Sequence, residues 1–234
     1  MSITTTTGSG TAATRPPTAV ILGIDDDFGL ALVRSFLEIG GTIFGGTEDP
    51  GAPVIAALST QYSRTFHAIA VDPASILSVT SAAAILKQAD ISVDMLICNV
   101  DRRTHDSLED GLDFDAMKRT FDINALAPIR FMEAFLPLTK SGLKRLCFVT
   151  SAMGSLGTAT GGRDFAYSMS KTSLNRTVMI MSNHLSKEGY TFRVFIPNAG
   201  GTESARSARD YFLNARDDEF RLVIVDDKGH EWPF

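Results

Sequence analysis

The chain has 234 residues, and 44% of them are hydrophobic, which is enough for one α/β domain with a substantial core. Its formal net charge of −5 argues against nucleic acid or an anionic membrane surface as a partner. No apolar run reaches the roughly 18 residues that a membrane-spanning helix needs.

The composition of residues 1–17 predicts a disordered tail. The segment is rich in Thr, Gly and Ser, ends at Pro16 and Pro17, and lacks the apolar centre of a signal peptide. Cys98 and Cys147 each lie within an apolar run, so we expect buried, reduced thiols in a cytoplasmic protein.

From residue 18 to residue 234, strand-like and helix-like segments alternate without an internal repeat or linker. The expected strands are 18–24, 41–46, 65–72, 93–99, 144–151, 190–197 and 221–226, and the expected helices are 28–41, 53–61, 73–88, 113–138, 165–187 and 203–214. The strands are apolar almost throughout, which is typical of a parallel sheet covered on both faces. We therefore expect one α/β domain with a doubly wound, Rossmann-like parallel sheet of about seven strands.

The stretch from Ser151 to Lys171 carries side chains suited to proton transfer. Tyr167 and Lys171 are four residues apart on an expected helix and therefore share a face. The lysine charge stabilises a phenolate, which predicts a lowered pKa for Tyr167. Ser151 ends an apolar run and could hold a substrate oxygen in line with the phenol. The alternative is an ordinary helix surface, because such a Tyr-Lys spacing also occurs by chance.

Ser151-x-x-Gly154 followed by Tyr167-x-x-x-Lys171 resembles the active-site segment of the short-chain dehydrogenase/reductase family. The longer run GSLG…GG…FAYSMSKTSLN looks like the C-factor-type branch of that family. The resemblance covers residues 19–234 and implies NAD or NADP as cofactor, a small-molecule substrate, and no metal. It implies catalytic roles for Ser151, Tyr167, Lys171 and Asn124, and cofactor contacts from Gly23, Gly29, Asp72, Asn99 and Thr202.

Pro128 adds a physical argument for Asn124. Proline has no N–H, so the carbonyl of Asn124 loses its partner in the helix and can hold a water molecule. In the family, that water links the lysine to solvent as a proton relay. The other interpretation is a plain proline kink.

The expected cofactor cradle departs from the family pattern. The first turn reads Gly23-Ile-Asp-Asp-Asp-Phe-Gly29, so the outer glycines are present and Asp27 stands in the middle position. A carboxylate can cap a helix, but about 5 Å from a diphosphate charge it costs on the order of 3 kcal/mol. Asp101 likewise replaces the last residue of the family's Asn-Asn-Ala-Gly, close to where the cofactor ribose would lie.

Two further segments give no clear cofactor signal. Glu48 and Asp49 come slightly late after the second expected strand, so neither NAD nor NADP is selected. The family's Pro-Gly after the sixth strand is Pro197-Asn198, and the segment before the next helix, which forms a lid in the family, is short.

Three functions remain open from the sequence. The first is an oxidoreductase that passes a hydride between NAD(P) and a carbonyl or alcohol, with Tyr167 as general acid/base. The second is a cofactor-independent isomerase, cyclase or lyase that uses Tyr167, Lys171 and Ser151, and the third is a non-catalytic binding or regulatory member. We expect a homodimer or homotetramer, because the 113–138 and Tyr167 helices carry many Phe and Met side chains.

Overall fold

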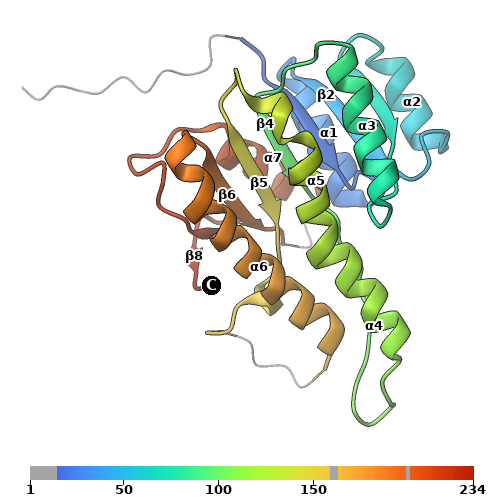
Figure 1. Ribbon diagram of the computed structural model, residues 1–234, viewed down its shortest axis with the longest axis vertical. Coiled ribbons are helices and arrows are strands. Elements are labelled where there is room, and N and C mark those ends of the chain that lie inside the picture. Colours follow the sequence, from blue (N-terminus) through green and yellow to red (C-terminus); the bar gives the residue numbers. More distant parts are fainter. Residues whose placement is uncertain (1–14, 159–162, 199–200) are drawn as a thin grey trace, which may run out of the picture.

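The computed structural model describes residues 15–158, 163–198 and 201–234 (Figure 1). Within them, eight strands form one sheet in the order β3-β2-β1-β4-β5-β6-β7-β8. The strands are β1 (Thr18–Leu22), β2 (Thr42–Thr47), β3 (Phe66–Ala70), β4 (Met95–Cys98), β5 (Arg145–Val149), β6 (Thr191–Ile196), β7 (Ile224–Asp226) and β8 (Glu231–Trp232). All pairings are parallel except that of β7 with β8. The expected doubly wound sheet is confirmed, with the short β8 as an additional edge strand.

Helices cover both faces of this sheet (Figure 1). They are α1 (Asp27–Glu38), α2 (Pro53–Gln61), α3 (Ile76–Gln88), α4 (Phe114–Phe121), α5 (Ala127–Phe135), α6 (Phe165–Leu185) and α7 (Gly201–Leu213). One core lies under α1, α2 and α7, and the other lies under α3, α5 and α6. Every residue of β5 and β6 is buried, as the apolar runs predict for central parallel strands.

The expected helix 113–138 is helical throughout Phe114–Thr139 in the structure, but it is not a regular α-helix along its whole length. A π-helical turn at Asp122–Leu126 separates α4 from α5, and a 3₁₀ turn at Leu136–Thr139 follows α5. Pro128 has no N–H to donate to the carbonyl of Asn124, and the helix widens at that point. The long helical stretch is therefore confirmed, and the position of its π-helical turn agrees with the proline argument.

The start of the domain lies earlier than residue 18. Arg15 forms an ion pair with Asp94 (2.8 Å), and the Asp94 carboxylate also accepts a hydrogen bond from Thr18 N at 2.9 Å. Arg15 is therefore attached to the sheet rather than part of a free tail. Residues 1–14 of the predicted tail lie outside the described residues.

Both thiols are buried, as the sequence predicts, and burial raises the pKa of Cys98 and of Cys147 to about 12. They are therefore protonated and unreactive at neutral pH. Among the described residues, no helix has the length and apolar character needed to cross a membrane.

Two buried arginines connect the sheet to the end of α7. Arg145 of β5 donates to the carbonyl of Phe212 at 2.7 Å, and Arg193 of β6 is fully buried. Glu219 accepts hydrogen bonds from Arg193 (2.6 Å) and Arg145 (3.2 Å). The carboxylate thus partly compensates two positive charges that the fold removes from water.

Candidate functional site

Two adjoining cavities lie at the carboxyl ends of the central strands. One, of about 410 Å³, lies beside the ends of β1, β2 and β4, and the other, of about 460 Å³, lies beside the ends of β5 and β6. Asp26, Asn99, Asp101 and Arg103 line both. In a doubly wound sheet, the point between β1 and β4 where the strand order reverses is the usual ligand site.

The second cavity brings together the predicted proton-transfer side chains. Tyr167 and Lys171 from α6 and Ser151 from the end of β5 all line it, so the predicted shared helix face is confirmed. Tyr167 is 2% exposed and Lys171 is 1% exposed. The Ser151 hydroxyl accepts a hydrogen bond from Met153 N at 3.2 Å, which places it at the start of a short 3₁₀ turn.

The start of α6 is held by a residue that the sequence analysis missed. The Asp106 carboxylate accepts hydrogen bonds from the backbone N–H groups of Phe165 and Ala166, the first residues of the helix. A carboxylate in this position satisfies free N–H groups and interacts favourably with the helix dipole. Asp106 therefore fixes the turn of α6 that presents Tyr167.

Asp101 connects the two central groups of the cavity. Its Oδ1 lies 2.8 Å from Lys171 Nζ, and its Oδ2 accepts a hydrogen bond from Tyr167 Oη at 3.3 Å. Arg103 Nε also donates to Oδ2 at 3.3 Å, and the Arg103 guanidinium carbon lies 4.7 Å from the centroid of the Tyr167 ring. Lys171 Nζ additionally donates to the carbonyl of Val100 at 3.3 Å.

The pKa of Tyr167 is shifted in the direction opposite to the expected one. Burial raises the pKa of the phenol; Lys171 lowers it, Asp101 raises it further, and the result is a pKa above the ordinary value. Burial alone would raise the pKa of Asp101, but Lys171 and Arg103 bring it below its usual range. The prediction of a lowered Tyr167 pKa was wrong chiefly because it left out the burial of the phenol; the Asp101 carboxylate, which it also left out, acts in the same direction as burial.

Asn124 is fully buried and holds the loop that carries Asp101. Its Oδ1 accepts a hydrogen bond from Arg102 N at 2.7 Å, and its Nδ2 donates to Arg102 O at 2.9 Å. The same Nδ2 donates to the Ser170 hydroxyl at 3.0 Å, which joins the loop to α6. The proposed relay water on the Asn124 carbonyl stays a prediction.

In the turn between β1 and α1, side chains of the protein itself form hydrogen bonds with the backbone. Asp26 caps α1, accepting a hydrogen bond from Gly29 N at 2.6 Å, and Asp27 is the first helical residue. Asn99 Nδ2 donates to the Gly23 carbonyl (2.7 Å) and to Asp26 Oδ1 (3.2 Å). Burial raises the pKa of Asp26.

Gly23 and Gly29 are both required by close packing in this turn. A Cβ on Gly29 would lie 2.4 Å from the Gly23 carbonyl oxygen, and a Cβ on Gly23 would lie 2.8 Å from Val100 N. Gly23 also has a φ of +86°, which disfavours any other residue.

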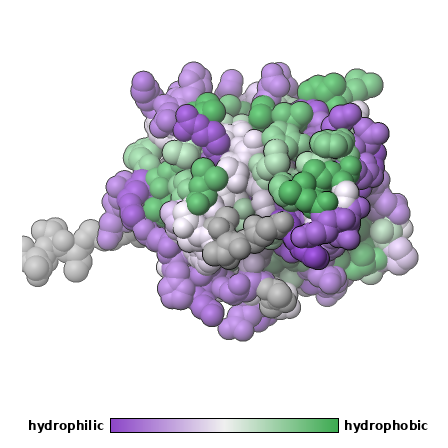
Figure 2. Space-filling model, turned by 90° about the horizontal axis from the view of Figure 1, so that it is seen from below, coloured by the Kyte–Doolittle hydropathy of each residue, from purple (hydrophilic) through white to green (hydrophobic). Residues whose placement is uncertain are grey.

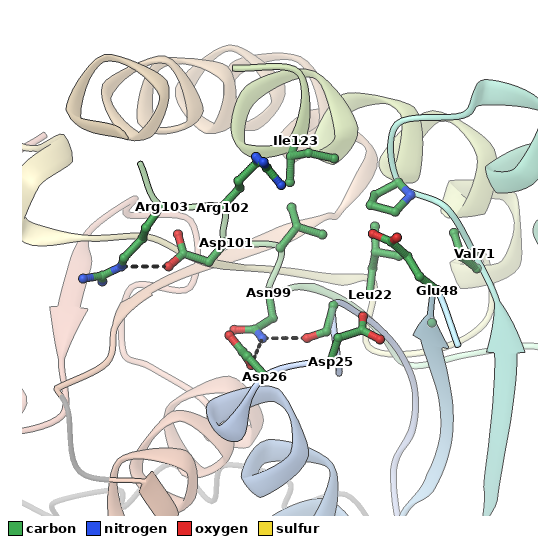
Figure 3. A pocket seen from close by; sticks show the side chains of 14 residues that line it. Leu22, Asp25, Asp26, Glu48, Val71, Asn99, Asp101, Arg102, Arg103 and Ile123 are labelled. Carbon is green, nitrogen blue, oxygen red and sulfur yellow. Dashed lines mark hydrogen bonds and ion pairs between the residues drawn. The ribbon is translucent and has the colours of Figure 1, made fainter. Parts of the chain in front are cut away.

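The first cavity contains an acid that the sequence analysis placed too far along the chain. β2 extends to Thr47, so Glu48 follows it directly and lines the cavity. Figure 3 shows Asp25, Asp26 and Glu48 around this space, with Ile123 across from Asp26. An acid at this place suits a ribose 2′-hydroxyl and opposes a 2′-phosphate.

The remaining predicted cofactor residues lie at the margins. Val71 and Pro73 line the first cavity on either side of Asp72, whose carboxylate accepts a hydrogen bond from Ala74 N at 2.8 Å. Thr202 is exposed in the first turn of α7, next to Gly201, which lines the second cavity. The residues just before α7, 199 and 200, lie outside the described residues.

The two ends of the paired cavities suit a nicotinamide dinucleotide, but a carboxylate between them would repel its diphosphate. Glu48 at one end and Tyr167 with Ser151 at the other are suitable partners for a ribose and for a reacting oxygen. Between them, Asp26 occupies the α1 N-terminus, which would otherwise receive a diphosphate. We therefore expect weak dinucleotide binding.

Comparison with known proteins identifies the family. Residues 17–211 match the family model described as short chain dehydrogenase. The chain is 42% identical over 105 residues to the C-signal of Myxococcus xanthus, an alignment that covers 42% of this chain and 63% of that protein. It is 29% identical over 186 residues to the 1-hydroxy-2-glutathionyl-2-methyl-3-butene dehydrogenase of Rhodococcus sp. strain AD45, covering 80% of this chain and 79% of that one.

The fold agrees with this match. The solved structure of the NADPH-bound carbonyl reductase from chicken fatty liver superposes with a TM-score of 0.81 at 18% identity, covering 94% of this chain and 100% of that chain. The chain therefore belongs to the short chain dehydrogenase family of oxidoreductases.

Proposed function

We propose that the protein reduces a carbonyl group of a small molecule, with a nicotinamide dinucleotide as cofactor. The observation that carries this proposal is the cavity in which the buried Tyr167 lies together with Lys171 and Ser151. A phenol that stays protonated at neutral pH is a proton donor, and carbonyl reduction needs a proton at the oxygen.

Three side chains of the second cavity have different roles in the proposed reduction. The Ser151 hydroxyl donates a hydrogen bond to the substrate carbonyl oxygen and orients it. The Tyr167 hydroxyl then gives its proton to that oxygen, and the Lys171 ammonium stabilises the phenolate that remains. Glu48 and Asn99 would hold the cofactor, and Glu48 favours NAD over NADP. When bound, a reduced nicotinamide supplies the hydride for the carbonyl carbon.

The test is steady-state reduction of a panel of aldehydes and ketones with NADH and NADPH. Tyr167→Phe should lower kcat by about 100-fold or more, because a positioned general acid contributes about 10²–10⁴. Tyr62→Phe, which removes a hydroxyl at the end of α2, is the matched control and should keep full activity. Full activity of Tyr167→Phe on a substrate of the wild type would refute the proton-transfer role.

A second candidate is a cofactor-independent enzyme that catalyses enolisation, isomerisation or elimination. It is favoured by Asp26 at the α1 N-terminus and by Asp101 on Lys171, since both carboxylates stand where a dinucleotide would need positive partners. Titration with NADH and NADPH, followed by nicotinamide fluorescence, separates the two candidates. Saturable binding supports the reductase, whereas absence of binding together with Tyr167-dependent proton exchange from a ketone supports the second candidate.

A further inference from the structure

The two oxygens of the Asp101 carboxylate face different members of the catalytic group. Oδ1 pairs with the Lys171 ammonium at 2.8 Å, while Oδ2 accepts the hydrogen bond of the Tyr167 hydroxyl at 3.3 Å. Lys171 Nζ lies 5.8 Å from the centroid of the Tyr167 ring. The carboxylate thus contacts both groups directly, from a loop on a different element.

We propose that Asp101 is a positioning residue that keeps Tyr167 protonated, by accepting the phenol hydrogen bond and by pairing with Lys171. The chemical consequence, a site poised to donate a proton, rests on the proposed reductase function. The effect on Tyr167 itself follows from the contacts alone.

Three physical effects of Asp101 act in the same direction. Its negative charge opposes a second negative charge on the phenolate, and its acceptor oxygen stabilises the neutral phenol. Its ion pair with Lys171 also reduces the positive field that would otherwise favour the phenolate. Removing the carboxylate charge should therefore make Tyr167 easier to ionise.

The other charged groups around the phenol do not replace Asp101. Arg103, from the same loop, lies over the ring and favours the phenolate, as does Lys171 of α6. Asp26 and Asp27, from the turn between β1 and α1, line the same cavity. Asp101 is the acid that contacts the Tyr167 hydroxyl directly.

The proposal also gives the reaction a preferred direction. Oxidation of an alcohol needs Tyr167 as a phenolate to accept the proton, and this form becomes abundant only at alkaline pH. Reduction needs the phenol and is favoured at neutral pH. The rate of reduction should therefore fall as pH rises through the pKa of Tyr167.

The test is ultraviolet titration of tyrosinate absorbance in the intact protein, without substrate or cofactor. The chain has four tyrosines, and the difference between wild type and Tyr167→Phe isolates the signal of Tyr167. We expect the pKa of Tyr167 to lie above the ordinary tyrosine value in the wild type, and to be at least about one pH unit lower in Asp101→Asn. An unchanged pKa of Tyr167 in a folded Asp101→Asn protein would overturn the proposal.

Asp110→Asn is the matched control. It makes the same chemical change in the same loop, and Asp110 accepts a hydrogen bond from the Ser107 hydroxyl rather than from the phenol. The Tyr167 pKa should stay unchanged in this variant, and an equal fall in both variants would contradict a specific effect of Asp101.

A second measurement keeps the proposal testable if Asp101→Asn does not fold. In wild-type protein labelled with ¹³C at the tyrosine ζ carbon, NMR should show Tyr167 titrating above the ordinary range of a tyrosine. Titration near neutral pH would overturn the proposal. Absence of reductase activity with the expected titration would refute only the proposed function, and an unshifted titration in an active reductase would refute only the role of Asp101.

Discussion

Asp26 determines how well the first turn can receive an anion. Its carboxylate already accepts the hydrogen bond of Gly29 N and lies beside Asn99. A diphosphate brought to the same N–H groups would meet a negative charge at short range, at a cost on the order of 3 kcal/mol for a separation of about 5 Å. The same carboxylate stabilises α1 as its N-cap, so its removal has two opposed effects.

Asp26→Ser separates these two effects, because serine is also a good N-cap but carries no charge. We expect this variant to bind NADH at least about tenfold more tightly than the wild type, with a smaller gain at high salt. Nicotinamide fluorescence titration at two ionic strengths measures both quantities. Asp27→Gly with Asp26→Arg should tighten binding at least as much.

Asp49→Ser is the control for Asp26→Ser. Asp49 accepts a hydrogen bond from the backbone N–H of Gly51 in an exposed turn. Asp49→Ser therefore replaces the same kind of hydrogen-bonded carboxylate as Asp26→Ser, but outside the two cavities. It should leave NADH affinity unchanged. If the wild type already binds either dinucleotide with a low micromolar Kd, the repulsion argument for Asp26 is wrong.

At the scale of elements, Glu219 controls how firmly α7 and the loop after it are held on the sheet. Burial would raise the pKa of Glu219, but hydrogen bonds from Arg193 and Arg216 N and the charge of Arg145 lower it. Glu219→Gln leaves two buried arginines without this charge and should lower the free energy of unfolding by about 3 kcal/mol. Urea denaturation at neutral pH measures the change.

The pH dependence of this effect has a definite sign. Because the folded state lowers the pKa of Glu219, its contribution is present above the ordinary carboxyl pKa and is lost as pH falls through the lowered value. The stability difference between wild type and Glu219→Gln should therefore shrink below about pH 4. Glu231→Gln, which removes an exposed ion pair with Arg221, is the control and should cost much less than Glu219→Gln. An equal loss in both variants would contradict the account of Glu219.

The sequence predicted the elements better than their junctions. Alternating apolar runs identified the sheet and its helices, including the helical stretch over 113–138, but periodicity does not reveal the π-helical turn within it. The expected second strand ended at 46, whereas Thr47 continues it and bonds to Asp25, which brings Glu48 to the cavity. An error of one residue at a strand end thus changed the inference about the cofactor.

The candidate site shows the same limit. Tyr167 and Lys171 were predictable because four residues on a helix fix their relation. The contact between Tyr167 and Asp101 spans 66 residues of sequence, and local spacing contains no information on it. The sequence showed that Asp101 was unusual but could not show that its carboxylate would accept the hydrogen bond of the Tyr167 hydroxyl.

At the scale of the whole molecule, the surface formed by α4, α5 and α6 remains partly apolar. The exposed apolar side chains on these helices and the turn between them are Phe114, Leu126, Ile129, Met169 and Ile180. Figure 2 views the end from which α4 and the start of α6 project, and shows apolar patches between hydrophilic residues. We expect this surface to pair two copies of the chain into a homodimer, which could pair again into a homotetramer.

Ile180→Glu tests this assembly. The residue is 56% exposed on the outer side of α6, and a charge there should dissociate the oligomer at micromolar concentration. Leu77→Glu adds the same charge to α3 at a residue that is 73% exposed, and should leave the assembly unchanged. Sedimentation velocity measures both; a monomeric wild type would refute the expected dimer.

The packing around Gly23 and Gly29 limits what these glycines reveal, in a sequence of this family, about the use of a dinucleotide cofactor. Each glycine is demanded by neighbouring backbone, one by Val100 and the other by the Gly23 carbonyl, whether or not a dinucleotide ever binds. A descendant that stopped using NAD would still need both to fold. The presence of these two glycines in a sequence therefore indicates only that the turn has been retained. The charge of the residues between them is the better guide to whether the cofactor is still used.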